Sequence, residues 1–209
     1  KKEKIQTPFQ ESLKKILSNK LCLVSLIVLV ILILFSIFGP MFTGYESDSI
    51  DLLNMLTGPS DTHLLGTDEL GRDMFTRLAE GGRVSISVGL IATLFKLCIG
   101  VLLGCIAGLY GGIVESVIMR IVDIIMCFPF FVIALCIAAI TGPSFHNTIF
   151  IIGILGWPGV CRIVRSQVLS LKNVEYVDAA RSLGLNQMEI IFRHILPNAS
   201  GPIIVYTTL

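Results

Sequence analysis

Charged residues are scarce in this chain. Asp, Glu, Lys and Arg make up 15% of its 209 residues, whereas a soluble domain is about a quarter charged. Apolar residues reach 54%, and the mean hydropathy is +0.83. This composition excludes an ordinary soluble domain and indicates a polytopic membrane protein whose main surroundings are the lipid bilayer. The net charge is only +1, and we expect no nucleic-acid partner.

Motifs for enzymatic chemistry are also absent from the sequence. It contains no G-x-x-x-x-G-K-[ST] phosphate-binding loop, no His-Glu-x-x-His and no Gly-x-Ser-x-Gly. The six cysteines form no Cys-x-x-Cys pair and lie in or beside apolar spans, so we interpret them as small apolar fillers. His63 and Asp61 would supply only two ligands on a loop. We therefore expect no catalytic residue, no metal and no cofactor in this chain.

Long apolar runs predict the fold class. Residues 21–38 contain neither a charge nor a proline, and this length is close to the roughly 20 residues that cross a bilayer as a helix. We predict further spans at about 84–110, 117–140 and 146–166, and a fifth that begins near Pro202. The predicted fold is an all-α integral membrane bundle with about five of six spans, interpreted as a fragment of a longer chain.

The distribution of charge predicts the topology. Residues 1–20 carry six Lys and two acids, whereas residues 39–83 carry three Arg and eight acids. By the positive-inside rule, the first segment is cytoplasmic and the second is an extracytoplasmic loop. Four spans then return the chain to the cytoplasm before a loop at 170–198 within the core segment 84–209. We expect a multi-pass membrane protein, and a resemblance carried by the 170–198 loop implies the bacterial plasma (inner) membrane.

The extracytoplasmic loop has one amphipathic stretch. Thr67 is a plausible N-cap, and Asp68 and Glu69 would then occupy the favourable first turn. We predict a short surface helix here, with Asp73 paired to Arg77. Its apolar face would consist of Leu70, Met74, Phe75 and Leu78.

The second span has a face of small residues. Gly100, Gly104 and Gly108 repeat every four residues, and Ser85, Gly89 and Thr93 continue this spacing upstream. Small residues on one face let another helix approach closely, so we predict a helix-packing face.

Lys96 falls on the same face of the second span, near its middle. A charge at this depth costs about 2.5–3.5 kcal/mol on insertion scales. It should therefore face protein or water, which leaves three alternatives: an ion pair or backbone contact, the lining of a translocation path, or snorkelling to an interface.

Prolines mark the third and fourth spans. Pro129 should kink the third span, and Trp157-Pro158-Gly159 should break or bend the fourth. Bent helices can line a cavity, so Trp157 joins Lys96 as a candidate for the translocation path. Arg120 and Asp123 predict a local salt bridge at the start of the third span.

The loop at 170–198 predicts two jointed helices. The first covers Asn173 to Leu183 and stops at Gly184, and the second is capped by Asn186 and Glu189 and ends at Pro197. Ala179 and Ala180 would leave a smooth surface that fits a partner's groove.

This loop resembles the cytoplasmic coupling loop of binding-protein-dependent ABC importer permeases. The family pattern, an acid, two alanines, a glycine and Leu-Pro at fixed spacing, falls on Asp178, Ala179, Ala180, Gly184, Leu196 and Pro197, with Arg181 inside it. Four further stretches resemble the dipeptide, oligopeptide and nickel branch: Gly66–Asp73, Gly156–Gly159, Arg162–Arg165 and Arg193–Asn198. The chain departs from the family pattern at Asp178, where Glu is usual, and at His194, where Ile is usual.

The resemblance implies a permease subunit that works with other chains. Expected partners are a second homologous permease, two cytoplasmic ATPases that carry ATP and Mg, and an extracytoplasmic solute-binding protein. Closure of the ATPases would move the coupling loop and switch the spans between inward-facing and outward-facing states. Peptides are the expected substrate, with nickel or a metal chelate as the alternative. A channel, a secondary carrier and a membrane sensor remain alternatives from other classes.

Overall fold

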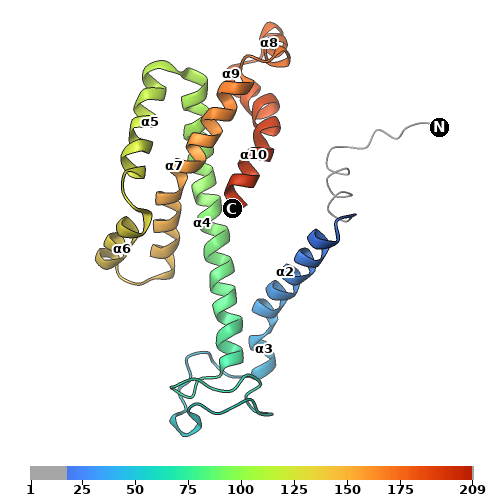
Figure 1. Ribbon diagram of the computed structural model, residues 1–209, viewed down its shortest axis with the longest axis vertical. Coiled ribbons are helices and arrows are strands. Elements are labelled where there is room, and N and C mark those ends of the chain that lie inside the picture. The colour runs from blue at the N-terminus through green and yellow to red at the C-terminus, as the bar shows by residue number, and fades with distance from the viewer. Residues whose placement is uncertain (1–17, 209) are drawn as a thin grey trace, which may run out of the picture. The chain divides into compact units, whose positions relative to one another are not determined.

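The computed structural model describes residues 18–208, and the chain divides into two compact units, Lys1–Ser87 and Val88–Leu209 (Figure 1). The described residues form helices and loops without a β-strand, apart from an isolated bridge between Thr67 and Asp73. Most of the predicted cytoplasmic segment 1–20 lies outside the described residues. The all-α fold class predicted from the sequence is confirmed.

Within residues 18–73 of the first unit, the structure has an apolar helix, α2 (Lys20–Phe38), a short helix, α3 (Pro40–Thr43), and a 3₁₀ turn, η1 (Leu52–Asn54). Asn19 caps α2 by accepting a hydrogen bond from the Leu21 N–H at 3.0 Å. Most side chains of α2 are apolar and exposed, which suits a helix surrounded by lipid. At its end, Phe35 packs edge-on against Phe75 with ring centroids 5.1 Å apart.

Helix α4 (Met74–Tyr110) runs from the first unit into the second. The prediction of a separate surface helix capped by Thr67 was wrong, because residues 67–73 fold into a tight loop and the helix begins only at Met74. Asp73 provides the cap instead: its carboxylate accepts a hydrogen bond from the Thr76 N–H at 2.8 Å. Helix α4 ends at Tyr110, the predicted end of the second span.

The predicted third span consists of two helices in the structure. These are α5 (Gly112–Met126) and α6 (Phe130–Thr141), and they meet at an angle of 81°. Pro129 precedes α6 and cannot donate a backbone hydrogen bond to the preceding turn. The predicted kink is therefore confirmed, and it is sharp enough to divide the helix.

The fourth span is one helix, α7 (Phe145–Leu171), with Pro158 inside it. The alternative that Trp157-Pro158-Gly159 breaks this span was wrong, because the helix continues on both sides of the proline. Three short elements follow: α8 (Glu175–Ser182), α9 (Gln187–Ile190) and a π-helical turn, η2 (Ile191–Ile195). Helix α10 (Leu196–Thr208) comes last and begins six residues before Pro202.

The small-residue face of α4 lies against α7. A Cβ atom added to Gly100 would be 2.6 Å from the Val160 Cβ. A Cβ added to Gly104 would be 2.7 Å from the Val164 Cβ, and one added to Gly108 would be 2.7 Å from the Val168 Cβ. The backbones can approach this closely only because the glycines lack side chains. Gly89, upstream in the same register, has no described atom within 4 Å of this position.

Among residues 18–208, three helices are long and apolar enough to cross a membrane, namely α2, α4 and α7. The bent pair of α5 and α6 makes a fourth span if its two halves cross together. Pro202, where a fifth span was predicted to begin, lies inside α10.

Candidate functional site: the coupling segment

Helix α8 is the first half of the segment predicted to couple to a partner. Glu175 and Asp178 lie in its first turn, where carboxylates interact favourably with the helix dipole. At the other end, Gly184 has a φ of +82°, and its N–H donates to the Arg181 carbonyl at 3.0 Å. The Leu185 N–H donates to the Ala180 carbonyl at 3.3 Å. These two bonds form a Schellman motif, which ends the helix at the predicted glycine.

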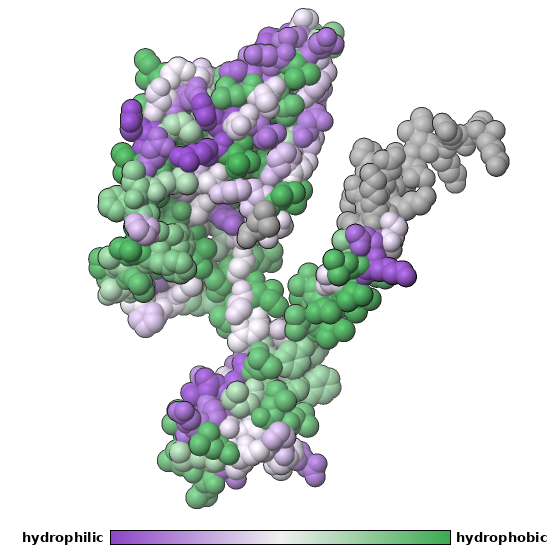
Figure 2. Space-filling model, viewed as in Figure 1, coloured by the Kyte–Doolittle hydropathy of each residue, from purple (hydrophilic) through white to green (hydrophobic). Residues whose placement is uncertain are grey.

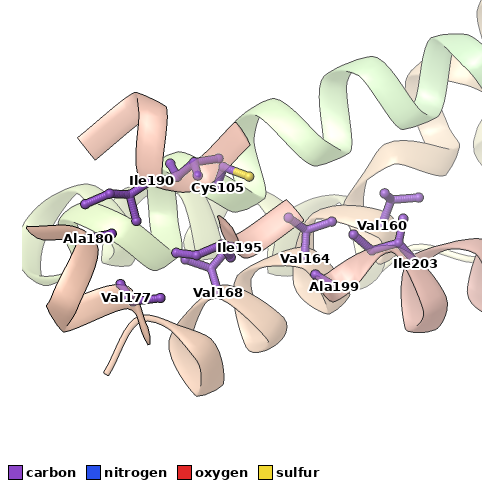
Figure 3. Packing of buried hydrophobic residues seen from close by; sticks show 11 residues of the cluster. Cys105, Val160, Val164, Val168, Val177, Ala180, Ile190, Ile195, Ala199 and Ile203 are labelled. Carbon is purple, nitrogen blue, oxygen red and sulfur yellow. The ribbon is translucent and has the colours of Figure 1, made fainter. Parts of the chain in front are cut away.

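One side of α8 is fixed in the interior of the second unit. Val177 and Ala180 are buried in the same apolar cluster as Val164 and Val168 of α7 (Figure 3). Ile190, Ile195 and Ala199 of the following helices belong to this cluster too. A displacement of α8 therefore disturbs the packing of α7 and α10 directly, because close-packed interiors deform little.

The two alanines of the predicted docking surface differ in their exposure to solvent. Ala179 is exposed, whereas Ala180 is buried. The prediction that both form a smooth outer surface was therefore wrong for Ala180, which faces the core because it lies three residues after Val177 on the same helical side. Large apolar side chains are exposed along the same segment, namely Leu183, Met188 and Phe192.

The second helix of the segment begins as the sequence predicted. The Asn186 side chain accepts a hydrogen bond from the Glu189 N–H at 2.8 Å. The prediction that Pro197 ends this helix was wrong. Pro197 lies just after the π-helical turn η2, and such a turn can accommodate the missing N–H inside a continuing helix. The π turn just before it lets α9 continue into α10.

Two ion pairs join α5 to α7 within the second unit. Arg162 donates to Asp123 at 2.7 Å, and the Arg165 Nε donates to Glu115 at 2.6 Å. The predicted local pair of Arg120 with Asp123 was therefore wrong, since Asp123 is bound across the helix interface instead. Sequence reasoning missed the Glu115–Arg165 pair, which joins residues 50 positions apart.

Lys172, at the end of α7, contacts the end of α4. Its Nζ donates to the Gly108 carbonyl at 3.1 Å. Lysine near a helix C-terminus satisfies a carbonyl that would otherwise lack a partner. Helices α4, α5 and α7 are thus tied together by polar contacts close to where the coupling segment begins.

Lys96 and Trp157 take different positions in the second unit. Lys96 is half-buried and passes beside Gly156, where an added Cβ would be 3.2 Å from the Lys96 Cδ. No salt bridge among residues 18–208 includes Lys96. Trp157 is 7% exposed and packs in a cluster with Val122 and Cys161. A role for either residue in a translocation path stays a prediction.

Comparison with known proteins places the chain in a family. Residues 100–209 match the family described as binding-protein-dependent transport system inner membrane component. The chain belongs to this permease family. Residues 7–59 match the N-terminal TM domain of oligopeptide transport permease C, which agrees with the branch expected from the sequence.

Relatives of the permease resemble it along nearly its whole length. The dipeptide transport system permease protein DppC of Alkalihalophilus pseudofirmus is 43% identical over 97% of this chain. The oligopeptide transport system permease protein OppC of Bacillus subtilis is 41% identical over 96%. The chain covers 67% and 66% of the length of these two relatives, about two thirds in each case.

Proposed function

We propose that this chain is the transmembrane permease subunit of an ATP-driven importer for dipeptides or oligopeptides. The observation that carries the proposal is the construction of α8, which is anchored by Val177 and Ala180 in the bundle core while Ala179 and Leu183 face outward. A partner that moves this helix moves the spans packed on it. The names of the relatives favour peptides over nickel as the substrate class.

The proposal includes the partner subunits and the orientation of the chain in the membrane. Two ATP-binding subunits that carry ATP and Mg dock on the coupling segment in the cytoplasm, so hydrolysis belongs to those chains. A second homologous permease completes the path, and an extracytoplasmic solute-binding protein delivers the peptide. The N-terminus lies in the cytoplasm, as the lysines of residues 1–20 favour.

Uptake into proteoliposomes tests the proposal. The full-length chain, reconstituted with its partner subunits and binding protein, should take up labelled dipeptide only when ATP is inside with the ATPases. Uptake of nickel without peptide uptake would refute the substrate assignment. Uptake of either solute without ATP would refute the importer and favour a channel or carrier.

A backbone variant tests the coupling segment itself. Gly184→Val should lower ATP-dependent uptake at least tenfold, since a β-branched residue is strained at a φ of +82°. The added Cβ meets no described atom within 4 Å, so the effect comes from the backbone alone. Gly81→Val is the matched control, because Gly81 lies in α4 and also has open space but no positive φ. Normal uptake by the Gly184 variant would remove the coupling assignment.

A further inference from the structure

The loop between α3 and α4, in the first unit, presents an apolar strap to water. We define the strap as residues 50–56. Five of its seven side chains are large and apolar, and they are between 46% and 96% exposed: Ile50, Leu52, Leu53, Met55 and Leu56. Large contiguous apolar patches on a protein surface usually mark a binding site. Figure 2 shows hydrophobic and hydrophilic residues side by side on this loop.

Backbone hydrogen bonds hold the strap against the turn that precedes α4. The Asp51 N–H donates to the Leu70 carbonyl at 3.2 Å, and the Leu56 N–H donates to the Asp68 carbonyl at 3.1 Å. The Thr67 hydroxyl donates to the Asn54 carbonyl at 2.5 Å. Because the backbone faces the turn, the apolar side chains are directed outward and cannot collapse into the loop.

Two glycines of the turn make this close approach feasible. A Cβ on Gly71 would clash with the backbone of Asp51, and a Cβ on Gly66 would clash with the backbone of Thr57. Both glycines have positive φ, a conformation that other residues adopt at a cost. Gly66 and Gly71 thus allow the turn to lie close to the backbone of Asp51 and Thr57, which holds the strap in place.

Leu56 is held in a strained conformation. Its φ is +50°, and among residues 18–208 it is the only residue other than glycine with a positive φ. A leucine both strained and exposed contributes little to the stability of the loop, because its side chain buries almost nothing. Strained residues of this kind gather at functional sites.

Carboxylates surround the strap and indicate which kind of partner it fits. Exposed acids lie within the strap, before it in sequence, or on the turn beneath it: Asp51, Glu46, Asp48 and Glu69. Hydrogen bonds from the Asn54 side chain and the Leu53 N–H hold the pKa of Asp51 below its usual range. Arg72 of the turn and Arg77 in the first turn of α4 are both engaged by Asp68. The strap is therefore an apolar surface with a negative border.

We infer that the strap is the docking surface for the extracytoplasmic solute-binding protein, through an apolar recess with a basic border on that protein. A negative border disfavours insertion of the leucines into a membrane surface, where anionic headgroups would repel the carboxylates. A protein with lysines or arginines around an apolar recess complements both features. The inference rests on the proposed function, because it assigns this loop to the extracytoplasmic side.

Binding measurements on the assembled importer test the strap. The complex with the full-length chain, in nanodiscs, is titrated with its purified solute-binding protein. Leu53→Ser combined with Leu56→Ser should weaken binding at least tenfold and leave the ATPase activity without binding protein unchanged. Leu64→Ser is the control, as an exposed leucine of the same loop outside the strap. Unchanged affinity of the double variant would refute the inference.

Fluorescence distinguishes a protein partner from the membrane. Leu53→Cys, labelled with an environment-sensitive maleimide dye in a complex whose other reactive cysteines are replaced, should shift its emission to shorter wavelength when the binding protein is added. Quenching by brominated lipids before that addition would mean that the strap lies in the bilayer, which overturns the inference. If the unmodified complex binds no solute-binding protein at all, the proposed function fails rather than the strap alone.

Discussion

At the scale of single residues, the missing side chain of a glycine matters at some positions of α4 and not at others. Gly104 and Gly89 share one helical register, but only Gly104 lies against α7. An added Cβ would be 2.7 Å from the Cys161 carbonyl oxygen at Gly104, and free of described neighbours at Gly89. The same substitution should therefore have opposite effects at the two positions.

Gly104→Ala should destabilise the second unit by roughly 1–3 kcal/mol, because α4 and α7 must separate to accept the methyl group. Gly89→Ala should be neutral or stabilising by up to about 1 kcal/mol, since alanine is the better helix former. Unfolding midpoints of the purified full-length variants measure both effects. Equal midpoints would mean that the two helices do not pack through this face.

A second residue, Asp73, holds the start of α4. Its carboxylate accepts hydrogen bonds from the Thr76 N–H and hydroxyl and from His63 at 3.0 Å. Partial burial opposes ionisation, but these donors outweigh it and hold the pKa of Asp73 below its usual range. His63 also stacks on Tyr45, with ring centroids 4.8 Å apart. This contact gives His63 a structural role beside Asp73 rather than beside Asp61.

Asp73→Ala should cost about 1–2 kcal/mol at neutral pH, the usual range for a lost helix cap. Because the folded pKa is lowered, the stability that the carboxylate adds is complete above the unfolded value near 3.9 and is lost as the pH falls below it. The difference in unfolding midpoint between parent and variant should therefore be constant from pH 7 to 5 and shrink towards pH 3. Asp61→Ala, exposed in the same loop, serves as the control, and an unchanged difference at low pH would contradict the role of the charge.

At the scale of helices, α8 has one face for the core and one for a partner. Ala180→Phe should destabilise the second unit by roughly 1–3 kcal/mol, because the buried cluster has no space for a ring. Ala179→Phe should leave stability unchanged and impair the ATP-driven uptake proposed for the importer. Thermal unfolding and uptake of the two variants separate these effects. If Ala179→Phe were the less stable variant, the orientation of α8 would be wrong.

The sequence predicted the spans better than it predicted their ends. Residues 21–38 and 84–110 are recognisable because an apolar run of that length has few other structures available. The start of α4 was missed because Thr67, a good cap by type, is bonded to Thr57 and Asn54 in the folded loop. Likewise, Asp123 has Arg120 nearby in sequence, but Arg162 reaches it across the helix interface. Local patterns carry no information about such distant partners.

At the scale of the whole molecule, the bent pair of α5 and α6 decides the topology. The 15 residues of α5 and the 12 of α6 span roughly 22 and 18 Å, so neither alone crosses a hydrocarbon core of about 30 Å. If the pair crosses once, three crossings separate the strap loop from the coupling segment, which then lie on opposite sides. If the pair re-enters on one side, only two crossings separate them and both segments lie on the same side.

Coupling to cytoplasmic ATPases requires a single crossing of the pair, and thiol labelling tests this. Asp61→Cys and Leu183→Cys are made separately in a chain whose six native cysteines are replaced by alanine. Both positions are exposed, Leu183 at 81%, so a membrane-impermeant maleimide can reach them. We expect Asp61→Cys to react in intact cells and Leu183→Cys only after permeabilisation. The reverse pattern would invert the orientation. Reaction of both in intact cells would make α5 and α6 a re-entrant loop, and the coupling segment could then no longer meet an ATPase.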